Sequence, residues 1–222
     1  MKRNILRTLE LLLLVFVPIV TWGQADLPTS GALTGSSYIL KKDQIQTGAL
    51  SIAAGHTVRV NLNGKKLSGN GTFQIFQVAS GGKLLISGGG TITGGSGENG
   101  GAIHCNGSLE ITGTASSRIV IEKNKATSGG GIYVRVSETG NCNISYCDIQ
   151  DNYATTNGGG LYSGVNTTIS YSNILRNRAM TSVPDRKTNN PNLGRGGGFY
   201  FVGNTTVKPV NKLIASTVNG NG

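Results

Sequence analysis

The sequence predicts an all-β protein, a right-handed parallel β-helix with three short strands in each turn of about 25–29 residues. Three observations lead to this fold class. Apolar and polar residues alternate with a period of two, and no helical period follows residue 23. A glycine-rich segment ending in an apolar residue recurs at 100–103, 129–132, 158–161 and 196–199. An aliphatic residue followed three positions later by asparagine recurs at 121–124, 149–152 and 174–177.

Residues 1–23 have the features of a cleaved export signal. Lys2, Arg3 and Arg7 form a basic head before the apolar run 11–20, and small residues follow near position 23. The apolar run is too short to span a bilayer comfortably, and no later segment resembles a membrane-spanning helix. We therefore expect a secreted or cell-surface protein.

Residues 24–55 are mixed in character and are predicted to form a lead-in or N-terminal cap for the solenoid. From residue 56 the strand alternation becomes regular, beginning with Val58, Val60 and Leu62. We therefore expect the β-helix itself to occupy residues 56–222.

Each turn is expected to contribute one residue to each of several inward columns. The first strand is predicted to place inward Ile103/Cys105, Ile132/Val134, Leu161/Ser163 and Phe199/Phe201. The second is predicted to contribute Ile86, Ile111, Ile144, Ile169 and Val207. The third is predicted to contribute Ile92, Ile121, Ile149, Ile174 and Val218.

An asparagine is expected at the turn after the third strand, at positions 124, 152, 177 and 221. Asparagine tolerates bent backbone, and its amide can bond to the turns above and below. Ala126, Ala154 and Ala179 suit a turn with little room, and the glycines allow positive φ or a close approach of neighbouring backbones.

These motifs resemble the repeat of the polymorphic outer membrane proteins, which are surface adhesins and autotransporters. Gly100-Gly101-Ala102-Ile103 matches the first half of that repeat. The second half, Phe-x-x-Asn, appears here with isoleucine in place of phenylalanine, as in 121–124. The likeness covers about residues 56–222 and extends to the broad right-handed β-helix class with its pectin-lyase-like architecture. The resemblance implies an exported surface setting and, by analogy, adhesion.

The basic composition does not indicate a nucleic-acid partner. The formal net charge is +10, but the lysines and arginines are scattered, with no run longer than two. No cofactor or metal site is expected either. Cys105, Cys142 and Cys147 fall at inward positions without metal-ligand spacing. They are interpreted as free core thiols, with a Cys142–Cys147 disulfide as the alternative.

The main rival function is cleavage of polysaccharides, because pectate lyases and polygalacturonases share this architecture. Such chemistry needs clustered acidic residues, and the nearest pair here is Asp148 and Asp151. In the stacking register Asp151 falls between Lys123 and Arg176. We therefore interpret both carboxylates as structural and keep them only as weak catalytic candidates. His56 and His104 are isolated from one another in this pattern.

The strongest candidate for ligand binding is an outward column in the first strand. His104, Tyr133, Tyr162 and Tyr200 are expected to stack as an aromatic stripe. Such a stripe could contact a polysaccharide or a cell-surface glycan, or it could simply stabilise the sheet. Tyr146 and Tyr171 form a second, shorter aromatic pair.

The sequence therefore predicts an exported surface protein acting in adhesion or glycan binding, without catalysis in this segment. A polysaccharide lyase or glycoside hydrolase is one alternative, and a passive structural stalk is another. Because the fourth turn stops just after Asn221, we expect a β-helix that is incomplete at its C-terminus. Its open edge is then expected to pair with missing sequence or with another chain.

Overall fold

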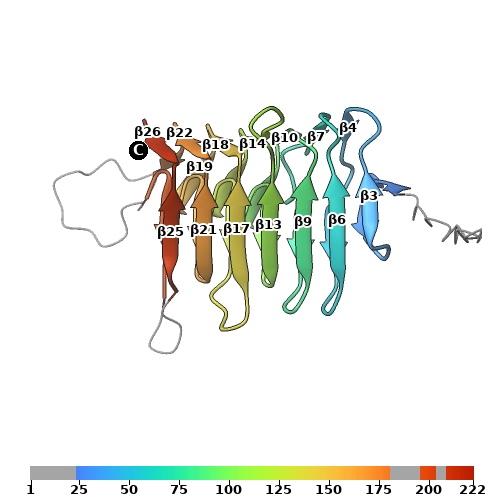
Figure 1. Cartoon of the computed structure of the whole chain (residues 1–222), viewed down its shortest axis with the longest axis horizontal. Helices are drawn as coiled ribbons and strands as arrows, with labels where there is room; N and C mark the ends of the chain where they lie inside the picture. Colours follow the sequence, from blue (N-terminus) through green and yellow to red (C-terminus); the bar gives the residue numbers. More distant parts are fainter. Residues whose placement is uncertain (1–23, 181–195, 204–208) are drawn as a thin grey trace, which may run out of the picture.

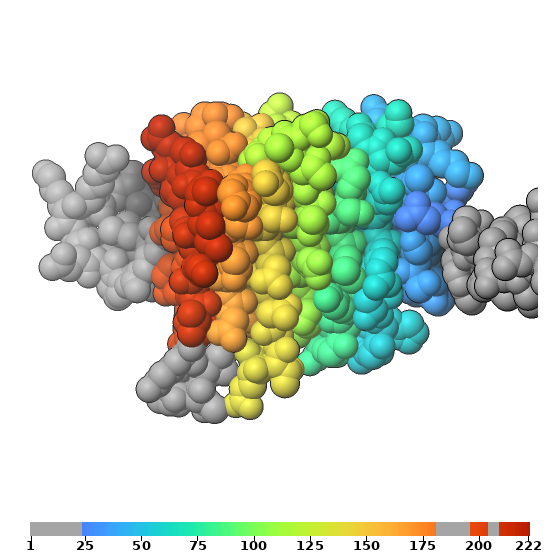
Figure 2. Space-filling view, in the orientation of Figure 1, coloured from blue at the N-terminus to red at the C-terminus, as the bar shows by residue number. Residues whose placement is uncertain are grey.

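The computed structural model describes residues 24–180, 196–203 and 209–222. These residues form strands and turns, with no helix among them. The chain winds as a right-handed parallel β-helix, and strands from successive turns lie side by side along its length (Figure 1). In the space-filling view the successive turns appear as adjacent bands, from blue to red in chain order (Figure 2). The predicted fold class is confirmed, while the export signal at 1–23 lies outside the described residues.

Three long sheets run the length of the solenoid. Sheet A has eight strands: β1 (Ala25–Asp26), β3 (Ser37–Ile39), β6 (Thr57–Asn61), β9 (Lys83–Ser87), β13 (Ser108–Thr112), β17 (Asn141–Ser145), β21 (Asn166–Ser170) and β25 (Asn211–Ile214). Sheet B has seven: β2 (Gly31–Ala32), β5 (Leu50–Ile52), β8 (Phe76–Val78), β12 (Ile103–Cys105), β16 (Ile132–Val134), β20 (Leu161–Ser163) and β24 (Phe199–Phe201). Sheet C also has seven: β4 (Gln44–Ile45), β7 (Lys66–Ser68), β10 (Gly90–Thr93), β14 (Ile119–Glu122), β18 (Cys147–Gln150), β22 (Asn173–Leu175) and β26 (Thr217–Asn219).

A fourth, shorter sheet lies between sheets C and B in the four turns that contain β12, β16, β20 and β24. Sheet D has four strands: β11 (Ser96–Asn99), β15 (Lys125–Ser128), β19 (Tyr153–Asn157) and β23 (Arg178–Ala179). The three predicted strands per turn are present, and sheet D adds one that the repeat pattern did not single out. The strands of sheet D carry few aliphatic residues, as in the Lys-Ala-Thr-Ser of β15, so they lack the apolar alternation by which the other strands were predicted.

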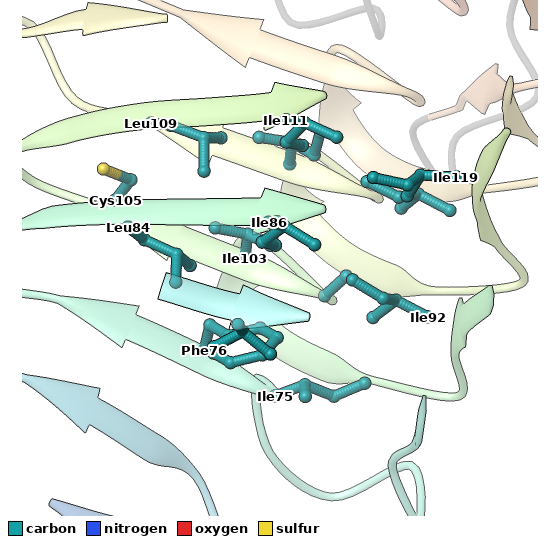
Figure 3. Close-up of a cluster of buried hydrophobic side chains, with 14 of the residues drawn as sticks. Ile75, Phe76, Leu84, Ile86, Ile92, Ile103, Cys105, Leu109, Ile111 and Ile119 are labelled. Atoms are coloured by element: carbon teal, nitrogen blue, oxygen red, sulfur yellow. The ribbon is translucent and has the colours of Figure 1, made fainter. Parts of the chain in front are cut away.

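The core consists of aliphatic columns that run along the inside of the solenoid. In register, Ile86 pairs with Ile111, and Ile111 with Ile144. Figure 3 shows Leu84 and Leu109 one above the other, with Ile86 and Ile111 beside them. These side chains are at most 1% exposed. Burial of each contributes about 1.5–3 kcal/mol, so the columns supply most of the stabilisation.

The turns between sheets are regular because the same position in each turn adopts the left-handed backbone. Between sheets C and D this residue is Lys123, Asp151 or Arg176, with φ of 54°, 53° and 53°. Left-handed backbone costs a non-glycine residue about 1–2 kcal/mol. Hydrogen bonds made by the following asparagine offset that cost. Asn152 Nδ2 donates to the carbonyl of Ile121 and to Asn177 Oδ1, at 2.8 and 2.9 Å.

Two details differ from the sequence-based expectation. Residues 24–55 contribute β1 to β5 to sheets A, B and C, so solenoid strands begin before residue 56. Their role as a cap stays a prediction.

The second difference concerns the last strand of sheet A. Ile169 pairs there with Leu213 rather than with Val207, which lies outside the described residues. The two residues are similar in character and close in sequence, so the apolar pattern alone could not separate them.

Candidate ligand-binding face

The outward residues of sheet B form one continuous column. We call this the sheet B column: Ser51, Gln77, His104, Tyr133, Tyr162 and Tyr200, each paired in register with the next. Each points outward because its two neighbours in the strand are inward, as Ile132 and Val134 are beside Tyr133. The expected stacking of the last four residues is therefore present in the structure. The column is polar at its N-terminal end and aromatic at its C-terminal end.

The aromatic rings of the sheet B column pack mainly against one another. Tyr133 and Tyr162 stack with ring centroids 4.6 Å apart and planes 15° from parallel. His104 meets Tyr133 edge-to-face at 5.5 Å, and Tyr200 is tilted against Tyr162 at 5.5 Å. The flat faces of Tyr133 and Tyr162 therefore cover each other. The ring edges and phenol oxygens are the parts available to a ligand lying on the sheet.

The column is uncharged near neutral pH. Partial burial raises the pKa of the Tyr162 phenol to about 12, and burial also raises the pKa of Tyr133. Burial lowers the pKa of His104 below its ordinary value, against the opposing effect of a hydrogen bond with Asn106. At pH 7 the stripe therefore presents neutral hydrogen-bonding groups.

A groove of about 580 Å³ lies at the polar end of the sheet B column. Residues from four successive turns line it: Ala32, Leu33, Thr34, Ser51, Ile52, Ala53, His56, Gln77, Val78, Ala79, His104 and Asn106. Its volume falls in the range of about 300–1,000 Å³ typical of sites for small ligands. His104 belongs both to the groove and to the aromatic stripe. The groove and the stripe are therefore parts of one face.

The groove exists because small side chains stand where other turns carry large ones. Ala53 and Ala79 are exposed and directly follow β5 and β8, and the equivalent residue two turns beyond Ala79 is Arg135. The sequence pattern separates His56 from His104, yet both line this groove. The structure therefore places in the lining of one groove two histidines that are isolated from one another in the sequence pattern. The groove could have been recognised in the sequence only from the small size of the residue that follows the sheet B strand in these turns. A pattern of apolar and polar residues does not distinguish side chains by size.

Asp148, one of the two weak catalytic candidates, is held by Arg118 on the outer face of sheet C. Its two carboxylate oxygens accept hydrogen bonds from Arg118 Nε at 3.0 Å, and Arg118 Nη2 donates to one of them at 2.7 Å. Asn173 donates to the same carboxylate at 2.6 Å. Arg118 also donates to the carbonyls of Cys147 and Tyr171. Asp148 thus joins neighbouring turns of the solenoid.

Asp151, the other candidate, is paired with Arg176 in the next turn. Arg176 Nε and Nη2 each donate to one carboxylate oxygen at 2.8 Å. This bidentate pair holds the pKa of Asp151 below its ordinary value. Lys123 lies on the other side and adds to the same effect. The predicted charge column is therefore present, and both carboxylates have structural partners.

Two other features have no part in this face. The rings of Tyr146 and Tyr171 stack with centroids 4.9 Å apart and planes 12° from parallel, at the turn between sheets A and C.

The three cysteines are free and fully buried, as expected of core thiols. Cys105, Cys142 and Cys147 are in register with Val134, Leu109 and Ile119, respectively. Burial raises the pKa of all three, that of Cys105 to about 11.

In the described part of the chain, histidine, cysteine and carboxylate side chains nowhere gather in threes as a metal site would require. The same residues include no helix of the length and apolarity needed to cross a membrane.

Comparison with known proteins gives one match, over a small part of the chain. Residues 118–135 match the family model of the Chlamydia polymorphic membrane protein (Chlamydia_PMP) repeat. This segment comprises β14, the turn at Asn124, β15, the glycines 129–131 and β16, which carries Tyr133. No curated protein and no solved structure matches the chain. The match and the solenoid together support a β-helix repeat protein.

Proposed function

We propose that this chain is an exported surface protein that binds a glycan along the outer face of sheet B and so acts in adhesion. The observation that carries the proposal is the sheet B column, an uncharged stripe continuous with a groove at one end. A ligand lying across the strands would meet one residue of the column per turn. Successive turns are about 4.8 Å apart, a spacing similar to the repeat of sugar units in an extended polysaccharide.

Two observations support the surface setting. One is the matched repeat, whose family name is that of a membrane protein of Chlamydia. The other is the export signal predicted from the basic head and apolar run of residues 1–23. Both fit an outer-membrane or secreted location.

The ring geometry defines how a glycan would bind. Because Tyr133 and Tyr162 cover each other's flat faces, the sugar rings would lie over the tyrosine edges. The phenol groups both donate and accept hydrogen bonds, as sugar hydroxyls do. The proposed contact is therefore a row of hydrogen bonds and edge contacts along the column.

The test is retention on a glycan array and on host-cell surfaces. The double variant Tyr133→Ala, Tyr162→Ala is expected to abolish retention. The matched control is Tyr146→Ala, Tyr171→Ala, which removes a stacked pair of nearly the same geometry from a different face. The control is expected to bind like the wild type.

A second variant pair separates binding from stability. Tyr133→Phe with Tyr162→Phe keeps the stacked rings and removes only the phenol oxygens, so weakened retention with unchanged thermal unfolding supports the proposed contact. Unchanged retention in both double variants would refute it and favour stabilisation of the sheet as the role of the stripe. Failure of the wild type to bind any glycan would favour the passive stalk. Asp148 and Asp151, each held by an arginine, do not favour polysaccharide cleavage.

A further inference from the structure

We propose that the groove on sheet B is a subsite for a neutral sugar unit and sets the class of glycan that the face accepts. This inference rests on the proposed function and adds to it the identity of the ligand. It concerns residues that the repeat pattern did not bring together, chiefly Ala53, His56, Gln77 and Ala79.

Four of the twelve residues that line the groove carry a hydroxyl or an amide. Thr34 and Ser51 offer hydroxyls, and Gln77 and Asn106 offer amides. Each of these groups can both donate and accept hydrogen bonds, which matches the dual character of sugar hydroxyls. Among the described lining residues there is no aspartate, glutamate, lysine or arginine. A phosphate, sulfate or uronate would find no lysine or arginine in the lining, although Arg135 lies close enough to His104 and Tyr133 to act on their pKa values. A neutral sugar needs no cation.

The imidazoles of the two histidines fit the same ligand. His104 Nε2 lies 3.2 Å from Asn106 Oδ1, and His56 Nδ1 lies 3.1 Å from the carbonyl of Ala54. Each ring nitrogen in these contacts faces an oxygen acceptor and so carries the proton in the neutral ring. The other nitrogen of each ring then remains an acceptor for a sugar hydroxyl.

Apolar surface completes the subsite. Leu33, Ile52 and Val78 are buried beneath the groove, and Ala53 and Ala79 are exposed along it. A pyranose ring has a C–H face that packs against such a surface while its hydroxyls point to the rim. A fully apolar ligand would instead leave the polar rim groups without partners, at a cost in binding.

The groove also continues the path of the stripe. His104 lines the groove and contacts the ring of Tyr133 in the next turn. A glycan crossing the strands therefore passes from the tyrosines into the groove without leaving the sheet. The tyrosines supply contact along the chain, and the groove recognises one sugar unit within it.

The test is titration of the full chain with neutral oligosaccharides of glucose, mannose and galactose, and in parallel with oligogalacturonate and heparin fragments. Ala79→Leu places a larger side chain in the groove without touching the tyrosines. It is expected to weaken binding of the neutral ligand at least about tenfold, equivalent to about 1.4 kcal/mol. Gln77→Leu removes a rim amide and is expected to weaken the same ligand. The matched control is Ala115→Leu, at an exposed alanine in the connection between sheets A and C.

The outcomes distinguish this inference from the proposed function. If neutral glycans bind and only the tyrosine variants weaken them, the groove is not a subsite, while the proposed function stands. If only the acidic glycans bind, the neutral class is wrong, and again the proposed function stands. If no glycan of either class binds, both proposals fail. Loss of neutral binding in Ala79→Leu and Gln77→Leu, with Ala115→Leu unchanged, supports the subsite.

Discussion

Asn152 shows at the scale of one residue how successive turns are joined. Its amide nitrogen donates to Ile121 O and to Asn177 Oδ1, and its oxygen accepts from Asn124 Nδ2 at 3.0 Å and from the backbone nitrogen of Asn124 at 3.1 Å. The side chain is 1% exposed, so water cannot replace these bonds. Asn124, Asn152, Asn177 and Asn221 form a ladder of side-chain hydrogen bonds from one turn to the next. This asparagine ladder stabilises the turn after sheet C.

Replacement of Asn152 by alanine is expected to lower the free energy of unfolding by about 3 kcal/mol, because buried groups in two adjacent turns lose their partners. The control is Asn143→Ala, an exposed asparagine in β17 of the same turn, for which a change within about 0.5 kcal/mol is expected. Urea unfolding followed by circular dichroism measures both. Equal losses in the two variants would contradict the role of the ladder.

The aromatic stripe could be predicted from the sequence because it depends only on alternation within a strand and alignment of the repeats. His104 and Tyr133 lie the same number of residues after the first glycine of their repeats. Aligning the repeats therefore predicts that the two residues pair, as they do in the structure. The groove could not be predicted in this way. It depends on the size of Ala53 and Ala79 and on the position of His56 in a turn between sheets, none of which belongs to the repeat motif.

At the scale of structural elements, the glycine turn between sheets D and B brings successive turns of the solenoid into close contact. Backbone amides of Gly130 and Gly131 donate to carbonyls of the next turn, at Gly158, Gly159 and Gly160. A Cβ atom at Gly130 would collide with the backbone of Gly159 and Tyr153. The glycine repeat is therefore explained chiefly by the close approach of neighbouring turns. Sheet D, which leads into this turn, was not predicted because its strands lack the aliphatic alternation of the other sheets.

We expect Gly130→Ala to lower the free energy of unfolding by more than about 4 kcal/mol, since the clash is with backbone that cannot rotate away. Gly55→Ala is the control. Gly55 has a φ of 74°, but a Cβ atom added there would have no heavy atom within 4 Å, so only conformational strain of about 1 kcal/mol is expected. Chemical denaturation of both variants gives the comparison. If the Gly130→Ala variant were as stable as the Gly55→Ala variant, successive turns of the solenoid would have to move apart at little cost, which contradicts the explanation by close approach.

At the scale of the whole molecule, the solenoid places its three cysteines in three different sheets around one core. Cys105 lies in sheet B, Cys142 in sheet A and Cys147 in sheet C, all with no exposed surface. Each turn contacts mainly its neighbours, so the cooperativity of a solenoid depends on coupling between turns. The three thiols therefore report whether the central turns open together.

We expect the three cysteines to react with a thiol reagent at equal rates, and only as fast as the protein unfolds, because each is buried and in its unreactive protonated form. Peptide mapping by mass spectrometry after pulsed labelling resolves the individual sites. The variant Ala115→Cys provides an exposed thiol that should react at once. Faster reaction of one buried cysteine would show that its sheet opens separately.

The register of the sheet B column makes the length of this outer face adjustable in steps of one turn. Ser128 and Asn157 occupy equivalent positions in adjacent turns, so loss of residues 129–157 would join two matching points of the solenoid. Tyr162 would then lie beside His104, and the face would shorten by about 4.8 Å. The groove from Ser51 to His104 would be unchanged. Gain or loss of a repeat would therefore change the length of the proposed glycan-binding face and leave the residues that line the groove unchanged.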